Sequence, residues 1–138
     1  MSLLRILFCL TALFVSAFPA GAAPRSVALL EFDDVAISSS SGKPLSNEQV
    51  RSAIIKGGAA HNWVASAPAG NAVKLTYSRR EFSATVQVTY NSKSYSIKYA
   101  DSTNLHYASE GGKAVIHPNY NKWMNSLRQS IDVALRSY

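Results

Sequence analysis

Three neighbouring segments in the middle of the chain alternate apolar and polar residues, as β-strands with one buried and one solvated face do. They span residues 73–77, 82–90 and 95–99. Residues 78–81 and 91–92 separate them and contain the serine, asparagine and charged side chains that favour tight reversals. The pattern predicts two consecutive β-hairpins in one antiparallel sheet, whose apolar face needs a cover.

A segment before these strands has the spacing of an amphipathic helix. Ser46 and Gln49 form a capping box, in which each side chain can bind a free backbone amide at the helix start. Apolar residues follow at helical spacing: Val50, Ala53 and Ile54. We expect this helix to end near Gly57 and Gly58, because glycine commonly terminates helices, although it could run on through Ala59 and Ala60.

A second helix is predicted at the end of the chain, after Pro118, which suits a first helical turn. Its apolar residues recur every three or four positions: Tyr120, Trp123, Leu127, Ile131 and Leu135. Two amphipathic helices on one face of an antiparallel sheet bury all three apolar surfaces in two layers. The predicted fold is therefore α+β, with an antiparallel sheet of four or five strands and two helices packed on one face.

The rest of the chain completes a single domain. The compact apolar run at residues 27–32 and the segment at 63–67 predict further strands, and residues 38–43, with four serines and a glycine, predict a loop. We therefore divide the domain into an N-terminal strand and serine-rich loop, residues 23–44, and an α+β core, residues 45–138.

One connection remains unusually long. Residues 100–117 show no strong period, although Gly111 and Gly112 mark a turn, and Val115 with Ile116 suits a short strand. Long loops in small domains are often functional.

The first 22 residues have the pattern of a cleaved signal peptide. Arg5 precedes an apolar run at residues 6–18, and small residues end at Ala22. Cys9, the only cysteine, lies inside that run, so we expect the mature domain to contain no disulfide and no lipid-anchoring cysteine. No later segment is apolar for long enough to predict a transmembrane helix. The sequence indicates export to the periplasm or the medium of a Gram-negative bacterium.

Charge narrows the expected partners. Without Arg5, 13 of the 14 lysines and arginines remain against 8 acidic residues, which gives the basic mature chain a net charge of +5. This balance favours an anionic envelope component or an acidic envelope protein as partner, although solubility alone would also explain it. Export argues against nucleic acid. We expect a monomer that needs no cofactor.

Two stretches resemble a known family. They read Tyr-Ala-Asp-Ser-Thr-Asn-Leu-His-Tyr at residues 99–107 and Ile-His-Pro-Asn-Tyr-Asn-Lys-Trp at residues 116–123. They are similar to small proteobacterial exported proteins, many of them lipoproteins, that carry Tyr-x-Asp-Ser-x-Asn-Leu-x-Tyr and Ile-His-x-Asn-Tyr-Asn-x-Trp. The resemblance covers about residues 45–135 and implies no particular activity. Because this chain lacks the lipoprotein cysteine, the resemblance implies a soluble exported form.

Polar residues gather in sequence around the long connection and the start of the last helix: Asp101, Asn104, His106, His117, Asn119 and Asn121. One hypothesis is a pocket in which His117 acts as acid or base and Asp101 orients it. The alternative, which we favour, is structural: these side chains shape the loop and cap the helix. The spacing of His106, His117 and Asp101 matches no metal-site signature, so we expect no metal.

A second candidate surface is the polar face of the predicted sheet. It contains Lys74 and Lys98 among serine, threonine and glutamine side chains, and Arg79 and Arg80 lie at one end of it. Paired guanidinium groups suit carboxylates and phosphates, although any solvated sheet also has a polar outer face. Trp63 and Trp123 could stack on a ligand, but their phase places them in or beside the core.

Three functions are compatible with these patterns. We expect a non-catalytic binding module of the bacterial envelope that uses Lys74, Arg79, Arg80 and Lys98. A small hydrolase or metal-dependent enzyme using His117, His106 and Asp101 is the first alternative. A surface antigen or inhibitor-like protein that makes contact through residues 100–117 is the second.

Overall fold

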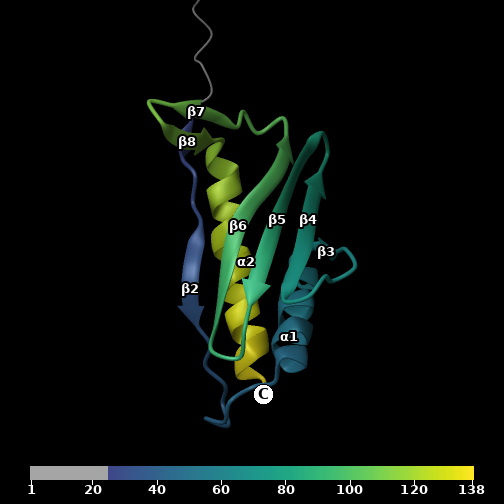
Figure 1. Cartoon of the computed structure of the whole chain (residues 1–138). Coiled ribbons are helices and arrows are strands. Elements are labelled where there is room, and N and C mark those ends of the chain that lie inside the picture. The colour runs from purple at the N-terminus through teal and green to yellow at the C-terminus, as the bar shows by residue number, and fades with distance from the viewer. Residues whose placement is uncertain (1–24) are drawn as a thin grey trace, which may run out of the picture.

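A computed structural model describes residues 25–138, and its largest element is a five-stranded antiparallel sheet (Figure 1). The strand order is β2-β6-β5-β4-β3. The bounds are β2 Phe32–Ala36, β3 Val64–Ala65, β4 Ala72–Arg79, β5 Phe82–Tyr90 and β6 Ser94–Thr103. The two predicted hairpins are confirmed, and the third alternating segment extends further than expected, to Thr103.

Two helices cover one face of this sheet. They are α1 Asn47–Ala59 and α2 Pro118–Arg136, and both lie behind the sheet in Figure 1. The capping box is formed, since Ser46 N donates to Gln49 Oε1 at 2.9 Å and Gln49 N donates to Ser46 Oγ at 3.1 Å. Pro118 occupies the first turn of α2. The predicted α+β fold, with two helices on one face of the sheet, is therefore confirmed.

The core lies between the helices and the sheet and follows the predicted apolar phases. The buried side chains on the three long strands are Val73, Leu75, Ala84, Val86, Val88, Tyr90, Tyr95 and Ile97. From α2 come Tyr120, Met124, Leu127, Ile131, Ala134 and Leu135. No polar or charged residue within 25–138 is classed as buried. The layers are thus joined mainly by apolar contact, which is the dominant favourable term in folding.

Helix α1 does not end at the two glycines but runs on to Ala59, the alternative that the sequence left open, and Gly57 and Gly58 lie buried inside it. A Cβ on Gly57 would lie 2.7 Å from Ile131 Cα and 2.8 Å from the Ser130 carbonyl oxygen, so α1 and α2 approach each other closely there. A Cβ on Gly58 would face the Leu75 side chain at 3.1 Å. The glycines therefore serve packing between elements, a role that sequence pattern alone does not distinguish from termination.

A second sheet, which was not predicted, has the strand order β1-β8-β7. Its strands are β1 Val27–Ala28, β7 Ala108–Glu110 and β8 Lys113–Ile116. The single strand expected at residues 27–32 was wrong, because the chain changes sheets there: β1 pairs with β8, and β2 pairs with β6. The change is fixed by Asn121 on α2, whose amide accepts from Leu30 N at 3.0 Å and donates to the Ala28 carbonyl at 2.8 Å.

The long loop predicted at residues 100–117 was also largely wrong. The end of β6 and the β7–β8 hairpin occupy most of it, and Gly111 and Gly112 form the hairpin turn with positive φ. The expected turn at Gly111 and Gly112 and the expected short strand at Val115 and Ile116 are confirmed, the latter as part of β8. Strand β7 was missed because all its side chains are exposed, so it has no apolar period. Similarly, the strand expected at 63–67 is reduced to two residues. The predicted leader at 1–22 lies outside the described residues.

Candidate functional site

The polar residues predicted to form a pocket near β6 are engaged in local structure. Asp101 Oδ1 accepts from Ser102 N at 2.8 Å, next to the bulge where β6 changes register against β5. Asn104 adopts a positive φ of 59° and donates to the Glu81 carbonyl at 2.7 Å, which ties the end of β6 to the β4–β5 turn. Both residues are exposed, and both bonds are those of turn-forming side chains.

The predicted residues at the start of α2 cap the helix and anchor the chain. His117 is the N-cap, and its Nδ1 accepts from Asn119 N at 3.1 Å. Asn121 holds residues 28–30 as described above, whereas His106 is exposed in the short connection between β6 and β7 at φ 53°. These contacts support the structural interpretation of the cluster. Among residues 25–138, no group of three or more histidine, cysteine, aspartate or glutamate side chains is placed to hold a metal ion.

The open face of the five-stranded sheet is polar as expected, but its charges are partly balanced. Lys98 Nζ lies 2.6 Å from Asp33 Oδ1 and 3.3 Å from Glu31 Oε2. The hydrogen bond to Asp33, more than that to Glu31, raises the pKa of Lys98. Lys74 is exposed on β4, where its register position lies opposite Gln87. Lys98 is thus engaged by two carboxylates, which leaves Lys74 as the lysine without an ion pair on the described open face.

Arg79 and Arg80 do not form a paired clamp on that face. Arg79 lies opposite Phe82 in the register, on the same side of β4 as Tyr77, and Arg80 occupies the turn with φ 54°. Successive residues of a strand point to opposite faces, so Arg79 belongs to the helix side of the sheet. The structure therefore separates the predicted basic residues over two faces and a turn.

The two tryptophans lie in or beside the core, as predicted. Trp63 is 3% exposed, and its ring centroid lies 5.5 Å from that of Tyr77. Tyr77 in turn lies 4.8 Å from Trp123, which is half-buried on α2. This aromatic row joins the segment between α1 and β3, the second half of β4 and the first turns of α2, so its contacts are those of packing between layers.

The sequence analysis missed a polar pocket between α2 and the end of β2. The pocket has a volume of about 170 Å³. It is lined by Ala36, Ser38, Arg128, Asp132, Leu135 and Arg136. Arg128, Asp132 and Arg136 are four residues apart along α2 and therefore lie on one side of the helix. Together they place two guanidinium groups and one carboxylate around the pocket.

Asp132 is held by partners on both of its oxygens. Tyr95 on β6 donates its hydroxyl to Asp132 Oδ1 at 2.5 Å, and Arg128 Nε lies 3.3 Å from Oδ2. Burial of Tyr95, together with its hydrogen bond to Asp132, raises the pKa of the tyrosine well above its usual range. Tyr95 therefore stays protonated and donates, so the carboxylate of Asp132 remains oriented toward the sheet.

Arg128 retains donor capacity. Its Nε is buried at ion-pair distance from Asp132 but makes no aligned hydrogen bond within residues 25–138. Its guanidinium carbon lies 5.6 Å from the centre of the Phe32 ring, which holds the planar group in place. Arg136 is exposed and has no ion pair in the described part of the chain. With two guanidinium groups and one carboxylate, the pocket carries a net charge of about +1 and suits an anionic group.

The charged residues of the pocket could have been found in the sequence from their helical spacing. Arg128, Asp132 and Arg136 follow the i, i+4, i+8 pattern of a solvated helix face, which is a common and weakly informative pattern. Only the structure places Ser38 at the pocket and Tyr95 at Asp132, because both residues come from distant segments of the chain.

Comparison with known proteins adds no assignment: no family model, curated protein or solved structure matches this chain. Within residues 25–138, neither helix is sufficiently long and apolar to cross a membrane.

Proposed function

We propose that this protein is an exported, non-catalytic binding module that holds a phosphate or carboxylate group of an anionic envelope component in the pocket beside α2. Export is supported by the leader pattern at residues 1–22, and an anionic partner by the mature net charge of +5. The observation that carries the proposal is the pocket between Arg128 and Arg136, where Tyr95 and Arg128 already engage the one carboxylate.

The chemistry of the pocket favours a compact, planar or tetrahedral anion. Guanidinium groups bind carboxylate and phosphate oxygens through two parallel N–H donors, and such charge-assisted bonds are stronger than neutral ones. A volume of about 170 Å³ corresponds to roughly five or six water molecules. That space admits one anionic group with some bridging water, while the rest of a larger partner would remain outside.

The experiment is an amide NMR titration of the labelled protein with inorganic phosphate and, separately, with acetate. We expect saturable shifts at residues 36–38 and 128–136 that weaken as sodium chloride is added, because salt screens exposed charges. Arg136→Gln should weaken phosphate binding about tenfold, as expected for loss of a hydrogen bond to a charged group. Comparing the two anions distinguishes a phosphate site from a carboxylate site.

The matched control is the double variant Arg79→Gln with Arg80→Gln, which removes two charges from the other end of the sheet. We expect this variant to bind phosphate as the unchanged protein does. Loss of binding in the control with no loss in Arg136→Gln would contradict the proposed pocket. Shifts that remain linear up to high anion concentration would contradict a specific anion site of any kind.

A further inference from the structure

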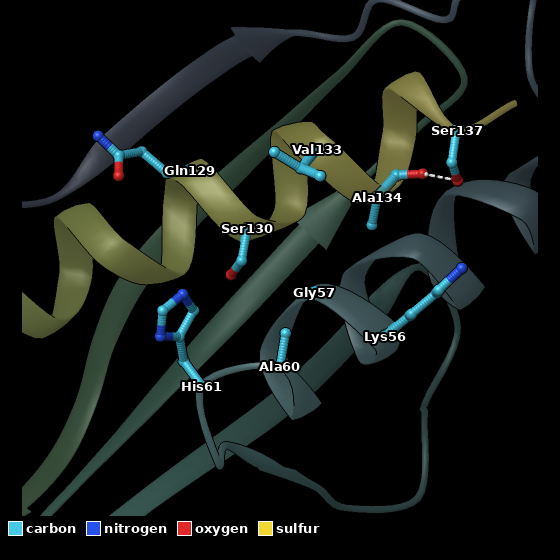
Figure 2. Close-up of a pocket in the computed structure, with 9 residues that line it drawn as sticks. All are labelled: Lys56, Gly57, Ala60, His61, Gln129, Ser130, Val133, Ala134 and Ser137. Atoms are coloured by element: carbon cyan, nitrogen blue, oxygen red, sulfur yellow. Dashed lines mark hydrogen bonds between the residues drawn. The ribbon is translucent and has the colours of Figure 1, made fainter.

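The other side of α2 faces α1 across a shallow groove of about 440 Å³ (Figure 2). One wall consists of Lys56 and Gly57 in the last turn of α1 with Ala60 and His61 just after it. The other wall consists of Gln129, Ser130, Val133 and Ala134 on α2 with Ser137 just after it. The groove lies on the outer side of the helical layer, away from the sheet. Its volume falls within the usual range of small-molecule sites.

The groove is formed by small and apolar residues. Gly57 brings the backbones of the two helices together, since a Cβ there would lie 2.7 Å from the Ile131 backbone. Ala60, Val133 and Ala134 line the groove above this contact, and Val133 is 61% exposed. Because Val133 is an exposed apolar side chain inside a groove, contact with another apolar group would remove it from water.

The groove also has one cationic group, Lys56, at one end. Figure 2 shows Lys56 extending toward the Ser137 end, while His61 lies toward Ser130 and Gln129 at the other end. Within residues 25–138, Lys56 forms no ion pair. A neutral apolar ligand would leave this ammonium group without a partner, and a fully polar ligand would leave the apolar walls exposed to water.

We propose that the groove between α1 and α2 binds a single-chain anionic amphiphile of the fatty-acid type. The hydrocarbon chain lies against Ala60, Val133 and Ala134, and the carboxylate lies at Lys56. Charge complementarity at Lys56 selects the anionic head, and the apolar walls select the chain. The site is separate from the polar pocket, because the two are lined by different residues of α2.

The test is an amide NMR titration with octanoate, decanoate and dodecanoate, each kept below its aggregation concentration, and with dodecanol as an uncharged comparison. We expect saturable shifts at residues 56–61 and 129–137. Affinity should rise about twofold to fourfold per methylene, as expected for partial to full burial of each group. Dodecanol should bind several-fold more weakly than dodecanoate.

Variants of the protein test the contacts of the carboxylate and of the hydrocarbon chain separately. Lys56→Gln should weaken dodecanoate binding about threefold to fivefold, as for an exposed ion pair, and leave dodecanol binding unchanged. Lys113→Gln, which removes an exposed lysine from β8, is the matched control and should change neither affinity. Val133→Glu should weaken dodecanoate binding more than Val133→Gln does. The two side chains have nearly the same shape, but only the glutamate carboxylate repels the anionic head group.

Three outcomes would overturn the proposal. Affinity independent of chain length would exclude an acyl site, and dodecanoate shifts confined to residues 36–38 and 128–136 would assign its carboxylate to the polar pocket instead. Groove signals that shift with protein concentration alone would show a second copy of the chain as the occupant. Because phosphate binding is measured independently, failure of the groove proposal leaves the proposed function untouched.

Discussion

The two flanks of the second half of α2 differ in chemistry although they belong to the same helix. The flank toward β2 carries Arg128, Asp132 and Arg136 and is joined to the sheet by the hydroxyl of Tyr95. The flank toward α1 carries Ser130, Val133 and Ala134 and meets α1 at Gly57 without a charged contact.

The difference shows how the size of the facing side chains sets the distance between α2 and the neighbouring element. Because Gly57 has no side chain, the backbones of α1 and α2 come into contact there. This contact forms the floor of the shallow apolar groove between the two helices. Toward β2, long arginine side chains keep space open between α2 and the loop that follows β2. One flank therefore depends on close packing, and the other on oriented hydrogen bonds and ion pairs.

The largest expected effect is that of Gly57→Ala. The new methyl group would meet the backbone of Ile131 and Ser130 at less than 3 Å, so the helices must separate. We expect a net loss of about 2 kcal/mol in the free energy of unfolding, because overpacking outweighs the helix propensity gained by alanine. Urea denaturation followed by circular dichroism measures it.

Gly58→Ala is the matched control for that change. Its methyl group would face the flexible Leu75 side chain at 3.1 Å instead of backbone, so the stability should change by less than about 1 kcal/mol. Equal losses at both glycines would show that close approach of the two helices at Gly57 has no special importance.

On the flank toward β2, Tyr95→Phe should lower the free energy of unfolding by about 1.5 kcal/mol, the lower end of the range for a hydrogen bond to a charged group. The variant removes the hydroxyl that donates to Asp132 and preserves the buried ring. Tyr90→Phe is the control, because the hydroxyl of Tyr90 lies a marginal 3.5 Å from the Gly70 carbonyl. A cost for Tyr90→Phe as large as that for Tyr95→Phe would contradict the proposed role of the Asp132 contact.

Alkaline pH should lower the stability of the whole fold through two buried tyrosines, of which Tyr95 belongs to the flank toward β2. Burial first, and the hydrogen bond to Asp132 second, raise the pKa of Tyr95, and burial raises the pKa of Tyr120. Unfolded tyrosine loses its proton near pH 10, while the folded residues keep theirs, so stability is complete below pH 10 and falls above it. The slope should approach about 1.4 kcal/mol per pH unit for each tyrosine.

Denaturation at pH 9, 10 and 11 tests this dependence. Tyr95→Phe should lose stability less steeply between pH 10 and 11 than the unchanged protein does, because one of the two tyrosines no longer titrates. Identical slopes would show that Tyr95 is not protected from ionisation in the folded protein.

The smallest effects on stability are expected where binding is proposed. Arg136 and Val133 are both exposed, so Arg136→Gln and Val133→Ser should each change the free energy of unfolding by less than about 0.5 kcal/mol. Thermal unfolding of the two variants checks this. A loss above 1 kcal/mol for either would indicate a structural role for that side chain.

The sequence predicted what depends on local periodicity. Alternation located the three long strands, and the Ser46–Gln49 pair located the start of α1 to the residue. The second sheet was missed because β1 has two residues and β7 has only exposed ones, so neither carries a period. Gly57 was misjudged because its packing partner, Ile131, lies 74 positions away in the numbering, and local sequence does not report such contacts.

The same distinction applies to the candidate sites. The polar residues around the connection at residues 100–117, such as Asp101 and His117, are engaged in local turns and caps. The polar pocket instead combines Ser38 with four residues of α2, one of which, Asp132, accepts from Tyr95, and the groove combines the ends of α1 and α2. Spacing along the chain could indicate the charged side of α2 but not what lies opposite it.

The most direct test of the difference between the two flanks is one labelled sample titrated first with phosphate and then with dodecanoate. We expect two separable sets of amide shifts, at residues 36–38 with 128, 132 and 136 for phosphate, and at residues 56–61 with 130, 133 and 134 for dodecanoate. Dodecanoate should bind equally well with and without saturating phosphate. A single shared set of shifts, or displacement of one ligand by the other, would contradict two chemically distinct flanks.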